Sequence, residues 1–368
     1  MRILKIIHTM GHGGAENIFR WLAWRLRKEG IEVIAGIPLN NNPSNKENWI
    51  TPALEELGIP YEHFDKTGSG FKLLKSLYCL IKKVQPDIVH SHLLDSNFYS
   101  AIVCRSMNIP HVCTEHGDIS FKSAPSIRIK FALLSLFTHS IICVSEAVRR
   151  RAARIAVFSS KLGLIYNGIV LSEGAGSTFR QEFGIPGESL LIGNVGNLYP
   201  VKGQQYLIHA FARFLEPFPG SYLVLVGRGD EKKSLEELRA RLGIPSNRVI
   251  FTGFRADVGN ILNALDIYVQ PSLSEGLPVS LLEAMSIGIP VIATDVGGVA
   301  EILGKGEHGL LISPESENDI YMSLMNIAQN IKVFKEKAIT SKMMVREKFS
   351  LDTMVYQHIA LYERVLKN

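Results

Sequence analysis

The sequence predicts an α/β protein made of two doubly wound domains, and three observations support that prediction. Short runs rich in β-branched residues alternate with longer stretches of helical periodicity, which is typical of βαβ units around a parallel sheet. The alternation restarts after a segment rich in Gly and Ser at 167–179, as a linker between domains would require. The length of 368 residues also exceeds that of one ordinary domain.

Strands are expected in both halves, and several are apolar on both faces, as strands covered by helices on each side are. In the first half they are ILKIIHT, EVIAGIP, DIVHSHL, HVCTEH, SIICVS and GLIYNG. In the second half they are LIGNVGN, YLVLVGRG, VIFTGF, IYVQPS, PVIATDV and GLLIS. The tail from about residue 335 has helical periodicity. We therefore expect domains over 1–172 and 173–345, with ligands at the carboxyl ends of the strands.

Composition and charge narrow the function classes. Hydrophobic residues make up 46% and charged residues 20% of the chain, as in a compact globular protein. The 40 basic and 35 acidic residues leave a net charge of +5, which fits an anionic substrate or membrane surface but is too small for a nucleic-acid footprint. The opening MRILKIIHT is strand-like rather than a signal peptide, and no apolar run approaches the roughly 20 residues of a membrane span. We expect a cytoplasmic protein that binds no nucleic acid.

The cysteines predict neither disulfides nor a zinc site. They are widely spaced, without a CxxC motif or a nearby His pair, and each falls in an apolar run: Cys79, Cys104, Cys113 and Cys143. Buried reduced thiols are the expectation. The sequence also contains no acidic cluster that is suited to a metal. No metal or other cofactor is therefore expected.

A glycine-rich turn, MGHGGAEN, follows the first expected strand. Gly13 and Gly14 allow the backbone to approach an anion just before a helix that is expected from about Ala15. The dinucleotide fingerprint would require glycine where Glu16 stands, and the second strand ends at 38–40 without an acid for a ribose. A nicotinamide enzyme is therefore disfavoured. A purely structural turn is as good an explanation as ligand contact.

Histidines and cations follow several expected strands. His116 in HVCTEHGD could donate to a sugar hydroxyl or steer a leaving group, or could be a loop histidine bonded to backbone. His90 and His92 share one face of a strand, and packing is favoured for them. Lys202 and Arg228 end strand-to-loop segments where a cation can meet a phosphate, although most loop lysines are merely solvated.

The stretch SEGLPVSLLEAM places two glutamates around an expected helix start. Pro278 suits the first turn, so Glu275 precedes the helix and Glu283 lies inside it. Amides around a helix N-terminus suit a pyrophosphate, and here they belong to Gly276, Leu277 and Val279. Two acids on either side of such a site suit a grip on both ends of a nucleotide better than a glycosidase pair, which flanks one bond at about 5–10 Å. Two solvated acids on a surface helix are the alternative.

These motifs fall in the order of a known family. E-G-L-P-V-S-L-L-E-A-M, followed by G-I-P-V-I-A-T-D-V-G-G, resembles the signature of the retaining family 4 (group 1) glycosyltransferases of GT-B fold. G-G-A-E, V-S-E-A-V, Y-N-G-I, V-K-G and F-T-G-F also follow the family's order, and the resemblance covers nearly the whole chain. It implies two Rossmann-like domains facing a cleft. It also implies that a helix at 346–368 crosses back to the N-terminal domain.

The resemblance further implies roles for single residues. A nucleotide-diphosphate sugar would lie on the C-terminal domain, with Glu283 on the ribose, Glu275 near the donor sugar and Lys202 on the phosphates. His116 would contact the donor sugar and the acceptor region, so the implied catalytic residues are His116, Lys202 and Glu275. The other implied donor-binding residues are Gly13, Gly14, Asn197, Arg228, Phe254, Arg255, Gly276, Leu277, Pro278 and Val279.

One position departs from the family. An arginine commonly follows the glycine before the phosphate-binding lysine, but this chain has Asn197. Asparagine cannot supply the forked cation of an arginine. Stabilisation of the leaving group would therefore rest on Lys202, on the helix amides and on Arg228.

The predicted activity is transfer of a sugar from a nucleotide-diphosphate sugar to a hydroxyl acceptor, with retention of configuration and without a metal. The product would belong to a surface polysaccharide or a glycolipid. One alternative is a sugar-nucleotide epimerase or hydrolase of the same fold. The other is a non-catalytic protein that binds a nucleotide sugar.

A basic and apolar stretch predicts a second property, docking on the inner face of an anionic membrane that carries a lipid-linked acceptor. Phe121–Phe137 mixes apolar residues with the cations Lys122, Arg128 and Lys130, and an arginine cluster follows: Arg149, Arg150, Arg151 and Arg154. Helices that pack on the sheet with solvated basic edges are the alternative.

Overall fold

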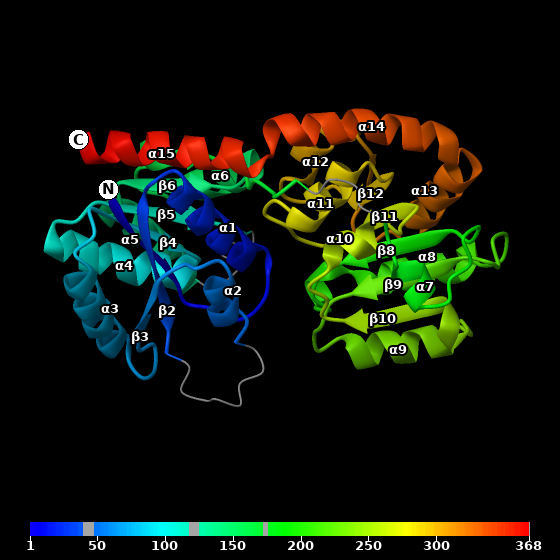
Figure 1. The fold of residues 1–368 in the computed structure, drawn as a ribbon, viewed down its shortest axis with the longest axis horizontal. Helices are drawn as coiled ribbons and strands as arrows, with labels where there is room; N and C mark the ends of the chain where they lie inside the picture. The colour runs from blue at the N-terminus through cyan, green and yellow to red at the C-terminus, as the bar shows by residue number, and fades with distance from the viewer. Residues whose placement is uncertain (40–47, 118–124, 172–175, 368) are drawn as a thin grey trace. The chain divides into compact units, whose positions relative to one another are not determined.

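The computed structural model describes residues 1–39, 48–117, 125–171 and 176–367. The chain forms two compact units (Figure 1). The first contains Met1–Val170 together with Ser350–Asn368, and the second contains Leu171–Phe349. Of the expected linker at 167–179, residues 172–175 lie outside the described residues.

The first unit contains a seven-stranded parallel sheet in the order β3-β2-β1-β4-β5-β6-β7. Its strands are β1 (Arg2–Ile7), β2 (Glu32–Pro38), β3 (Tyr61–Phe64), β4 (Ile88–His92), β5 (His111–Glu115), β6 (Ser140–Cys143) and β7 (Leu162–Leu164). Its helices are α1 (Gly14–Lys28), α2 (Ile50–Glu56), α3 (Gly70–Val84), α4 (Leu94–Met107), α5 (Pro125–Phe137), α6 (Glu146–Ala153), the 3₁₀ turn η2 (Ser159–Lys161) and α15 (Leu351–Lys367). The strand order reverses between β1 and β4, so this is the switch point of the sheet.

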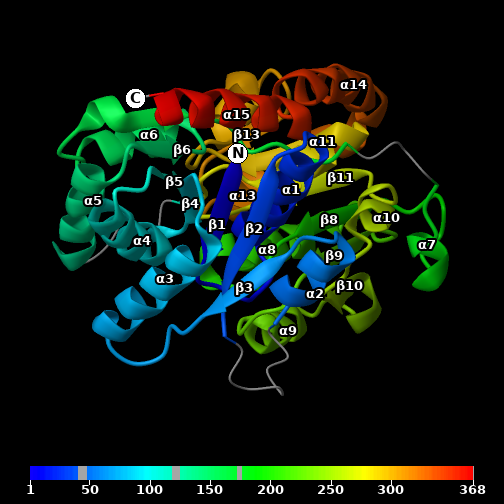
Figure 2. The ribbon, with the colours of Figure 1, turned by 60° about the vertical axis from the view of Figure 1, so that its left-hand side comes forward.

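Alternation along β1 gives the two faces of this sheet different chemistry. Leu4 and Ile6 join an apolar cluster with Val89 and residues of α3 and α4, and α3, α4 and α5 lie side by side on that face (Figure 2). Lys5 points to the other face, where its ammonium lies over the ring of Phe19 from α1. α1 and α15 pack against each other there.

The second unit contains a six-stranded parallel sheet in the order β10-β9-β8-β11-β12-β13. Its strands are β8 (Leu191–Val195), β9 (Tyr222–Val226), β10 (Val249–Gly253), β11 (Ile267–Gln270), β12 (Val291–Thr294) and β13 (Leu310–Ile312). Its helices are α7 (Phe179–Glu182), η3 (Pro200–Lys202), α8 (Gln204–Phe214), α9 (Lys232–Arg241), η4 (Ser246–Arg248), α10 (Val258–Leu262), α11 (Val279–Ile287), α12 (Val299–Ile302), η5 (Gly304–Gly306), α13 (Glu317–Gln329) and α14 (Ile331–Lys348). The switch point lies between β8 and β11.

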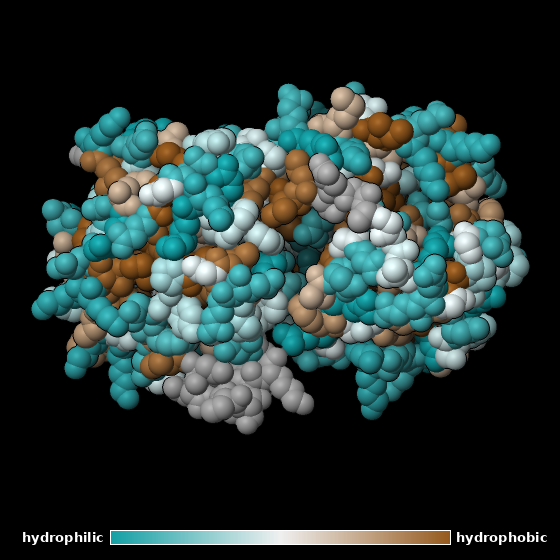
Figure 3. Space-filling model, in the orientation of Figure 1, coloured by the Kyte–Doolittle hydropathy of each residue, from teal (hydrophilic) through white to brown (hydrophobic). Residues whose placement is uncertain are grey.

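A continuous apolar core fixes the second sheet to its helices. Leu223 and Leu225 of β9 belong to one buried cluster with Phe211 and Phe214 of α8 and Leu324 of α13. The α8 residues recur at the spacing that puts one side of a helix on a sheet. Figure 3 shows hydrophilic and hydrophobic residues mixed over the visible surface of each unit.

The predicted α/β class with two doubly wound sheets is confirmed, and every expected strand is present. β3 (Tyr61–Phe64) was not predicted, because its sequence YEHF lacks β-branched residues and it pairs only with β2 at the sheet edge. The prediction for Cys79 is wrong, since this thiol is exposed on α3, whereas Cys104, Cys113 and Cys143 are buried and reduced. Among the described residues, no helix is long and apolar enough to cross a membrane.

Candidate functional site

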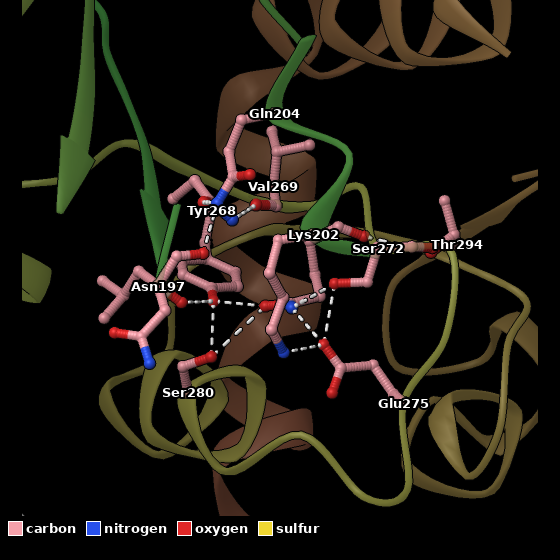
Figure 4. Close-up of polar contacts among 12 residues, drawn as sticks. Asn197, Lys202, Gln204, Tyr268, Val269, Ser272, Glu275, Ser280 and Thr294 are labelled. Carbon is pink, nitrogen blue, oxygen red and sulfur yellow. Dashed lines mark hydrogen bonds and ion pairs between the residues drawn. The ribbon is translucent and has the colours of Figure 1, made fainter. Parts of the chain in front are cut away.

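Two loops leave the switch point of the second sheet and bring Lys202 and Glu275 together. Lys202 follows β8 in the turn η3, Glu275 follows β11, and the N–H of Leu273 donates to the Val201 carbonyl at 2.8 Å. The Lys202 Nζ lies 2.6 Å from Glu275 Oε1 (Figure 4), and the two side chains are 25% and 9% exposed. A partly buried ion pair therefore occupies the place where ligands of doubly wound sheets bind.

Only one oxygen of the Glu275 carboxylate, Oε1, accepts hydrogen bonds within the described residues. Its Oε1 accepts hydrogen bonds from Lys202 Nζ, from Gln270 Nε2 at 2.9 Å and from Ser272 Oγ at 2.7 Å. Every hydrogen bond found to this carboxylate among the described residues ends on Oε1. The carboxylate is thus fixed in orientation while Oε2 keeps its capacity to accept a hydrogen bond from a ligand.

A buried tyrosine orients the amide that holds Glu275. The Tyr268 hydroxyl donates to Gln270 Oε1 at 2.6 Å and lies 2.9 Å from Ser280 Oγ. Burial raises the pKa of this hydroxyl, and the negative charges of Glu275 and Glu283 raise it further. The hydroxyl therefore stays protonated, and because Gln270 Oε1 accepts its proton, Gln270 Nε2 must face Glu275. The charges of Glu275 and Glu283 therefore both act on the Tyr268 hydroxyl.

The N-terminus of α11 begins beside this pair. Pro278 occupies the N-cap position, one residue before the first turn in which it was expected, and offers no side-chain acceptor to the first amides. Glu283 lies inside the helix, as predicted. A helix start without a side-chain cap is suited to an anionic ligand.

Gly297 and Gly298, the glycine pair of TDVGG, contact the loop that contains Glu275. Gly297 has φ +56°, and a Cβ added there would lie 1.8 Å from the Glu275 carbonyl oxygen. The N–H of Gly298 donates to the Gly276 carbonyl at 2.9 Å. Only glycine combines this backbone conformation with so close an approach, so β12 and its following turn set the position of Glu275.

The remaining residues predicted in this unit lie on neighbouring strand ends. Arg228 follows β9, and its guanidinium lies 5.7 Å from the centre of the Phe254 ring, which follows β10. The Asn197 carbonyl accepts from Gln204 Nε2 at 3.2 Å. The guanidinium of Arg255 forms ion pairs with the carboxylates of Glu182 and Asp257.

In the first unit, the glycine-rich turn before α1 leaves space for the buried carboxyl group of Glu16. Gly13 is the N-cap of α1 with extended backbone, and a Cβ there would lie 2.7 Å from Glu16 Oε2. Glu16 Oε1 accepts from Thr9 Oγ1 at 2.6 Å, and burial raises the pKa of this carboxyl. Gly14, the first residue of α1, is exposed. The glycine at position 13 thus makes room for Glu16, at the carboxyl end of β1.

His116 follows β5, and within the described residues its ring bonds to another histidine rather than to the backbone. Its Nε2 lies 2.8 Å from His92 Nδ1, and the two ring planes are 23° apart with centroids 5.1 Å from each other. Burial lowers the pKa of His116 to about 3, with further contributions from the positive charges of Lys5 and His358. The ring is therefore neutral at physiological pH and carries a single N–H.

The structure thus brings some predicted residues together and separates others. It pairs Lys202 with Glu275 and Arg228 with Phe254, while Gly13, Gly14 and His116 belong to the other unit. Sequence reasoning missed the residues that hold Glu275, namely Tyr268, Gln270, Ser272 and Ser280. The signal was available, since polar residues recur at every second position where the strand IYVQPS ends. In the part of the chain that the structure describes, no group of three His, Cys, Asp or Glu residues could hold a metal ion.

Comparison with known sequences identifies the class of protein. The family model described as glycosyl transferases group 1 matches residues 177–336, and the glycosyltransferase family 4 model matches residues 12–173. The UDP-Gal:alpha-D-GlcNAc-diphosphoundecaprenol alpha-1,3-galactosyltransferase of Escherichia coli is 30% identical over 275 residues, which cover 70% of each chain. The N-acetyl-alpha-D-glucosaminyl L-malate synthase of Bacillus anthracis is 26% identical over 370 residues, covering 97% of this chain and 95% of the relative. The chain is a glycosyltransferase and belongs to the group 1, family 4 type.

Solved structures agree on the fold. Anabaena Alr3699/HepE, crystallised in complex with UDP-glucose, superposes with a TM-score of 0.88 at 24% identity, covering 99% of this chain and all of that one. Sucrose-phosphate synthase from Thermosynechococcus elongatus gives a TM-score of 0.85 at 19% identity over 100% of this chain and 99% of the other. The fold is therefore that of the GT-B glycosyltransferases.

Proposed function

We propose that this glycosyltransferase moves a sugar from a nucleotide-diphosphate sugar to a hydroxyl acceptor, with retention of anomeric configuration. The observation that supports this proposal is the Lys202–Glu275 pair at the β8/β11 switch point, next to the N-terminus of α11. A cation, a helix start and an oriented carboxylate match the phosphates and the sugar hydroxyls of such a donor. The name of the Escherichia coli relative includes UDP-galactose and that of the Anabaena structure includes UDP-glucose, so a UDP-sugar is the proposed donor class.

The proposed reaction is a hexosyl transfer on one face of the sugar. The acceptor oxygen forms a bond to the anomeric carbon, the bond from that carbon to the phosphate oxygen breaks, and the acceptor proton passes to the departing phosphate. Negative charge grows on the phosphate, where Lys202 and the first amides of α11 would stabilise it. Leaving-group stabilisation is thus assigned to protein groups rather than to a metal.

Glu275 is proposed as a sugar-binding residue rather than a covalent nucleophile. Three hydrogen bonds hold its Oε1, one of them from an ammonium. Such bonds withdraw charge from the carboxylate and weaken it as a nucleophile, whereas they leave Oε2 able to accept from a sugar hydroxyl. Glu283, a turn further along α11, is the proposed ribose partner.

A donor screen with product analysis tests this proposal. A UDP-sugar at about one hundred times its Kd should stabilise the protein by roughly 2.7 kcal/mol, measured as a rise in melting temperature over the same concentration of free sugar. Proton NMR of the product should then show the anomeric configuration of the donor. An inverted product, or the absence of stabilisation by any nucleotide sugar, would overturn the proposal.

The same samples separate the alternatives. When no acceptor is present, a hydrolase would consume the donor and an epimerase would bring the donor to equilibrium with its epimer. A binding protein would be stabilised by the donor but would form no product with any member of an acceptor panel. The transferase should leave most of the donor intact until a hydroxyl acceptor is added.

A membrane-associated, lipid-linked acceptor is part of the proposal, and a surface of the first unit supports it. α5 exposes Ile129, Leu133 and Leu136 at helical spacing. Val157 and Phe158, also exposed, lie beside this row because the Val157 N–H donates to Ser135 Oγ at 2.9 Å. We call these five residues the α5 patch.

The cations that the sequence analysis singled out near α5 and α6 differ in their exposure and pairing. Arg128, Arg150 and Arg154 are exposed, whereas Lys130 pairs with Asp95 and Arg149 pairs with Glu146. Lys122 lies outside the described residues. An apolar row with basic neighbours is the composition that binds anionic lipid surfaces. The name of the Escherichia coli relative contains a diphosphoundecaprenol-linked acceptor, which such a surface would bring within reach.

Flotation with liposomes should reveal this docking. The protein is expected to float with vesicles that contain anionic lipid at low salt, and less at moderate salt because surface charge is screened. The double variant I129Q/L133Q should reduce the floated fraction severalfold. The control I339Q removes an exposed apolar residue of α14 instead and should change nothing. Equal flotation of the double variant and the wild type would remove the α5 patch from the proposal.

A further inference from the structure

The loop after β10 carries an aromatic ring on the same edge of the second sheet as the Lys202–Glu275 pair. Phe254 is 38% exposed, and the guanidinium of Arg228 lies 5.7 Å from the centre of its ring. The strand order β10-β9-β8 puts β10 two steps of about 4.8 Å from β8. A nucleotide whose phosphates meet Lys202 can therefore reach this loop, and an aromatic ring beside a guanidinium suits a planar base.

Arg255, the next residue, directs its hydrogen bonds to two carboxylates of the protein. Its Nη1 and Nη2 donate to the two oxygens of Glu182 at 2.5 and 2.8 Å. Its Nε and Nη2 donate to the two oxygens of Asp257, each at 2.8 Å. These bonds use four of the five N–H groups of a guanidinium. Both pairs are bidentate, which is the geometry in which a partly exposed ion pair contributes most.

The charges around Arg255 do not favour direct contact with an anionic ligand. The two carboxylates and the one guanidinium sum to −2 and +1, which leaves a net charge of −1. Hydrogen bonds from Arg255 hold the pKa of Glu182 and of Asp257 below their usual values, so both acids are charged at physiological pH. A nucleotide diphosphate is itself anionic and gains no net attraction from this group. That leaves the loop itself as the place where Arg255 acts.

Glu182 belongs to a short helix that is attached to the segment after the loop. Arg180 Nε of α7 donates to the Ala264 carbonyl at 3.0 Å, and the Thr178 N–H donates to Asn260 Oδ1 of α10 at 2.9 Å. Figure 2 shows α7 beside α10. The Glu182 carboxylate is therefore a fixed point, and an arginine bonded to it is fixed as well.

Phe254 thus lies between two attachments. On one side the Gly253 carbonyl accepts from the Gly227 N–H at 2.9 Å, and on the other the Arg255 guanidinium is held by its two carboxylates. We propose that Arg255 is a positioning residue, which fixes Phe254 for the base of the donor nucleotide and does not itself bind the donor. This role replaces the donor contact that the family resemblance implies for Arg255. The inference rests on the proposed function for the presence of a nucleotide donor.

Binding of UDP to variants of the full chain separates the two roles. R255A should raise the Kd for UDP by about 2- to 30-fold, measured by isothermal titration calorimetry. E182A should raise it too, although this change removes a negative charge near an anionic ligand. If Arg255 bound the donor directly, E182A would release its guanidinium and leave the Kd unchanged or lower. R255A/E182A, which restores the local net charge of the wild type, should bind UDP no more weakly than R255A does.

A conservative variant and a remote control complete the binding test. R255K keeps the charge but cannot form two bidentate pairs, so it should bind UDP as weakly as R255A. The control R213A removes an exposed arginine that bonds to Asn318 and should leave the Kd unchanged. At saturating donor, kcat of R255A should change little, because its ion pairs include neither Lys202 nor Glu275. A wild-type Kd in either E182A or R255K would overturn the proposal.

Hydrogen exchange tests the attachment of the loop without any ligand. A peptide that covers residues 253–257 should exchange faster in R255A and E182A than in the wild type, and at the wild-type rate in R213A. Unchanged exchange in both variants would show that Arg255 does not hold the loop, and E182A decides the question if R255A does not fold. If the wild type bound no UDP, the proposed donor class would fail together with the base-binding role of Phe254. The exchange rates would still decide whether Arg255 fixes the loop.

Discussion

Replacing Lys202 by alanine is expected to lower kcat/KM for sugar transfer by about 10²–10³-fold, the usual cost of losing one group that stabilises developing charge. Lys202 provides the ammonium next to the start of α11, and position 197 holds a neutral asparagine. The neutral side chain of Asn197 cannot take over the charge of the leaving phosphate. The rate of UDP release, measured with saturating acceptor, reports the loss directly.

Removing the lysine also affects the free protein, and the two effects can be separated. Glu275 is only 9% exposed, so K202A leaves a shielded carboxylate without its counter-charge, at a cost of about 1–3 kcal/mol. The double variant K202A/E275Q removes that charge and should recover most of the stability but none of the activity. K305A, in an exposed turn, is the control for loss of a lysine. Turnover in K202A equal to that of the wild type would show that Lys202 has no role in transfer.

The strand ends that carry the candidate site in the second unit were predictable, but the hydrogen bonds between its residues were not. Alternation of strands and helices predicts that Lys202 and Glu275 follow strand ends, and parallel strands bring such ends to one edge of the sheet. Spacing alone does not show that β8 and β11 are neighbours, since these strands are far apart in sequence. The ion pair between the two residues follows from that strand order.

The orientation of the residues that hold Glu275 could not be predicted from the sequence either. Tyr268 and Gln270 share a face of β11 by alternation, which the sequence contains. Whether Gln270 turns its oxygen or its nitrogen to Glu275 depends on the Tyr268 hydroxyl and on Ser280 from α11. Those contacts require the helix to pack on the strand, and no local pattern specifies them.

In the first unit, the sequence contains a signal that the sequence analysis did not use. ILKIIHT contains one lysine among apolar residues, in a strand expected to be covered on both faces. His92 was assigned a packing role, and it is indeed fully buried. Its contact with His116 depends on β4 lying between β1 and β5, and that strand order is not readable from local sequence.

Replacing Gly297 by alanine is expected to damage both stability and activity. The residue has φ +56°, which costs a residue with a Cβ about 1–2 kcal/mol. The added Cβ would also lie 1.8 Å from the Glu275 carbonyl oxygen, a contact that backbone atoms must move to relieve. Such overpacking costs a further 1–3 kcal/mol or so. A shift of about 1 Å in the Glu275 loop should lower kcat by about 10²-fold, measured together with the midpoint of urea unfolding.

Gly243 provides a matched control within the same unit. Its φ of +68° is similar, but a Cβ there would meet nothing within 4 Å. G243A should therefore show the conformational cost alone, with turnover unchanged. Because both variants bear that cost, the difference between them isolates the contact with the Glu275 carbonyl. If G297A and G243A retained equal turnover, the Glu275 loop would not need the position that Gly297 gives it, and Glu275 would lose its assigned place at the donor sugar.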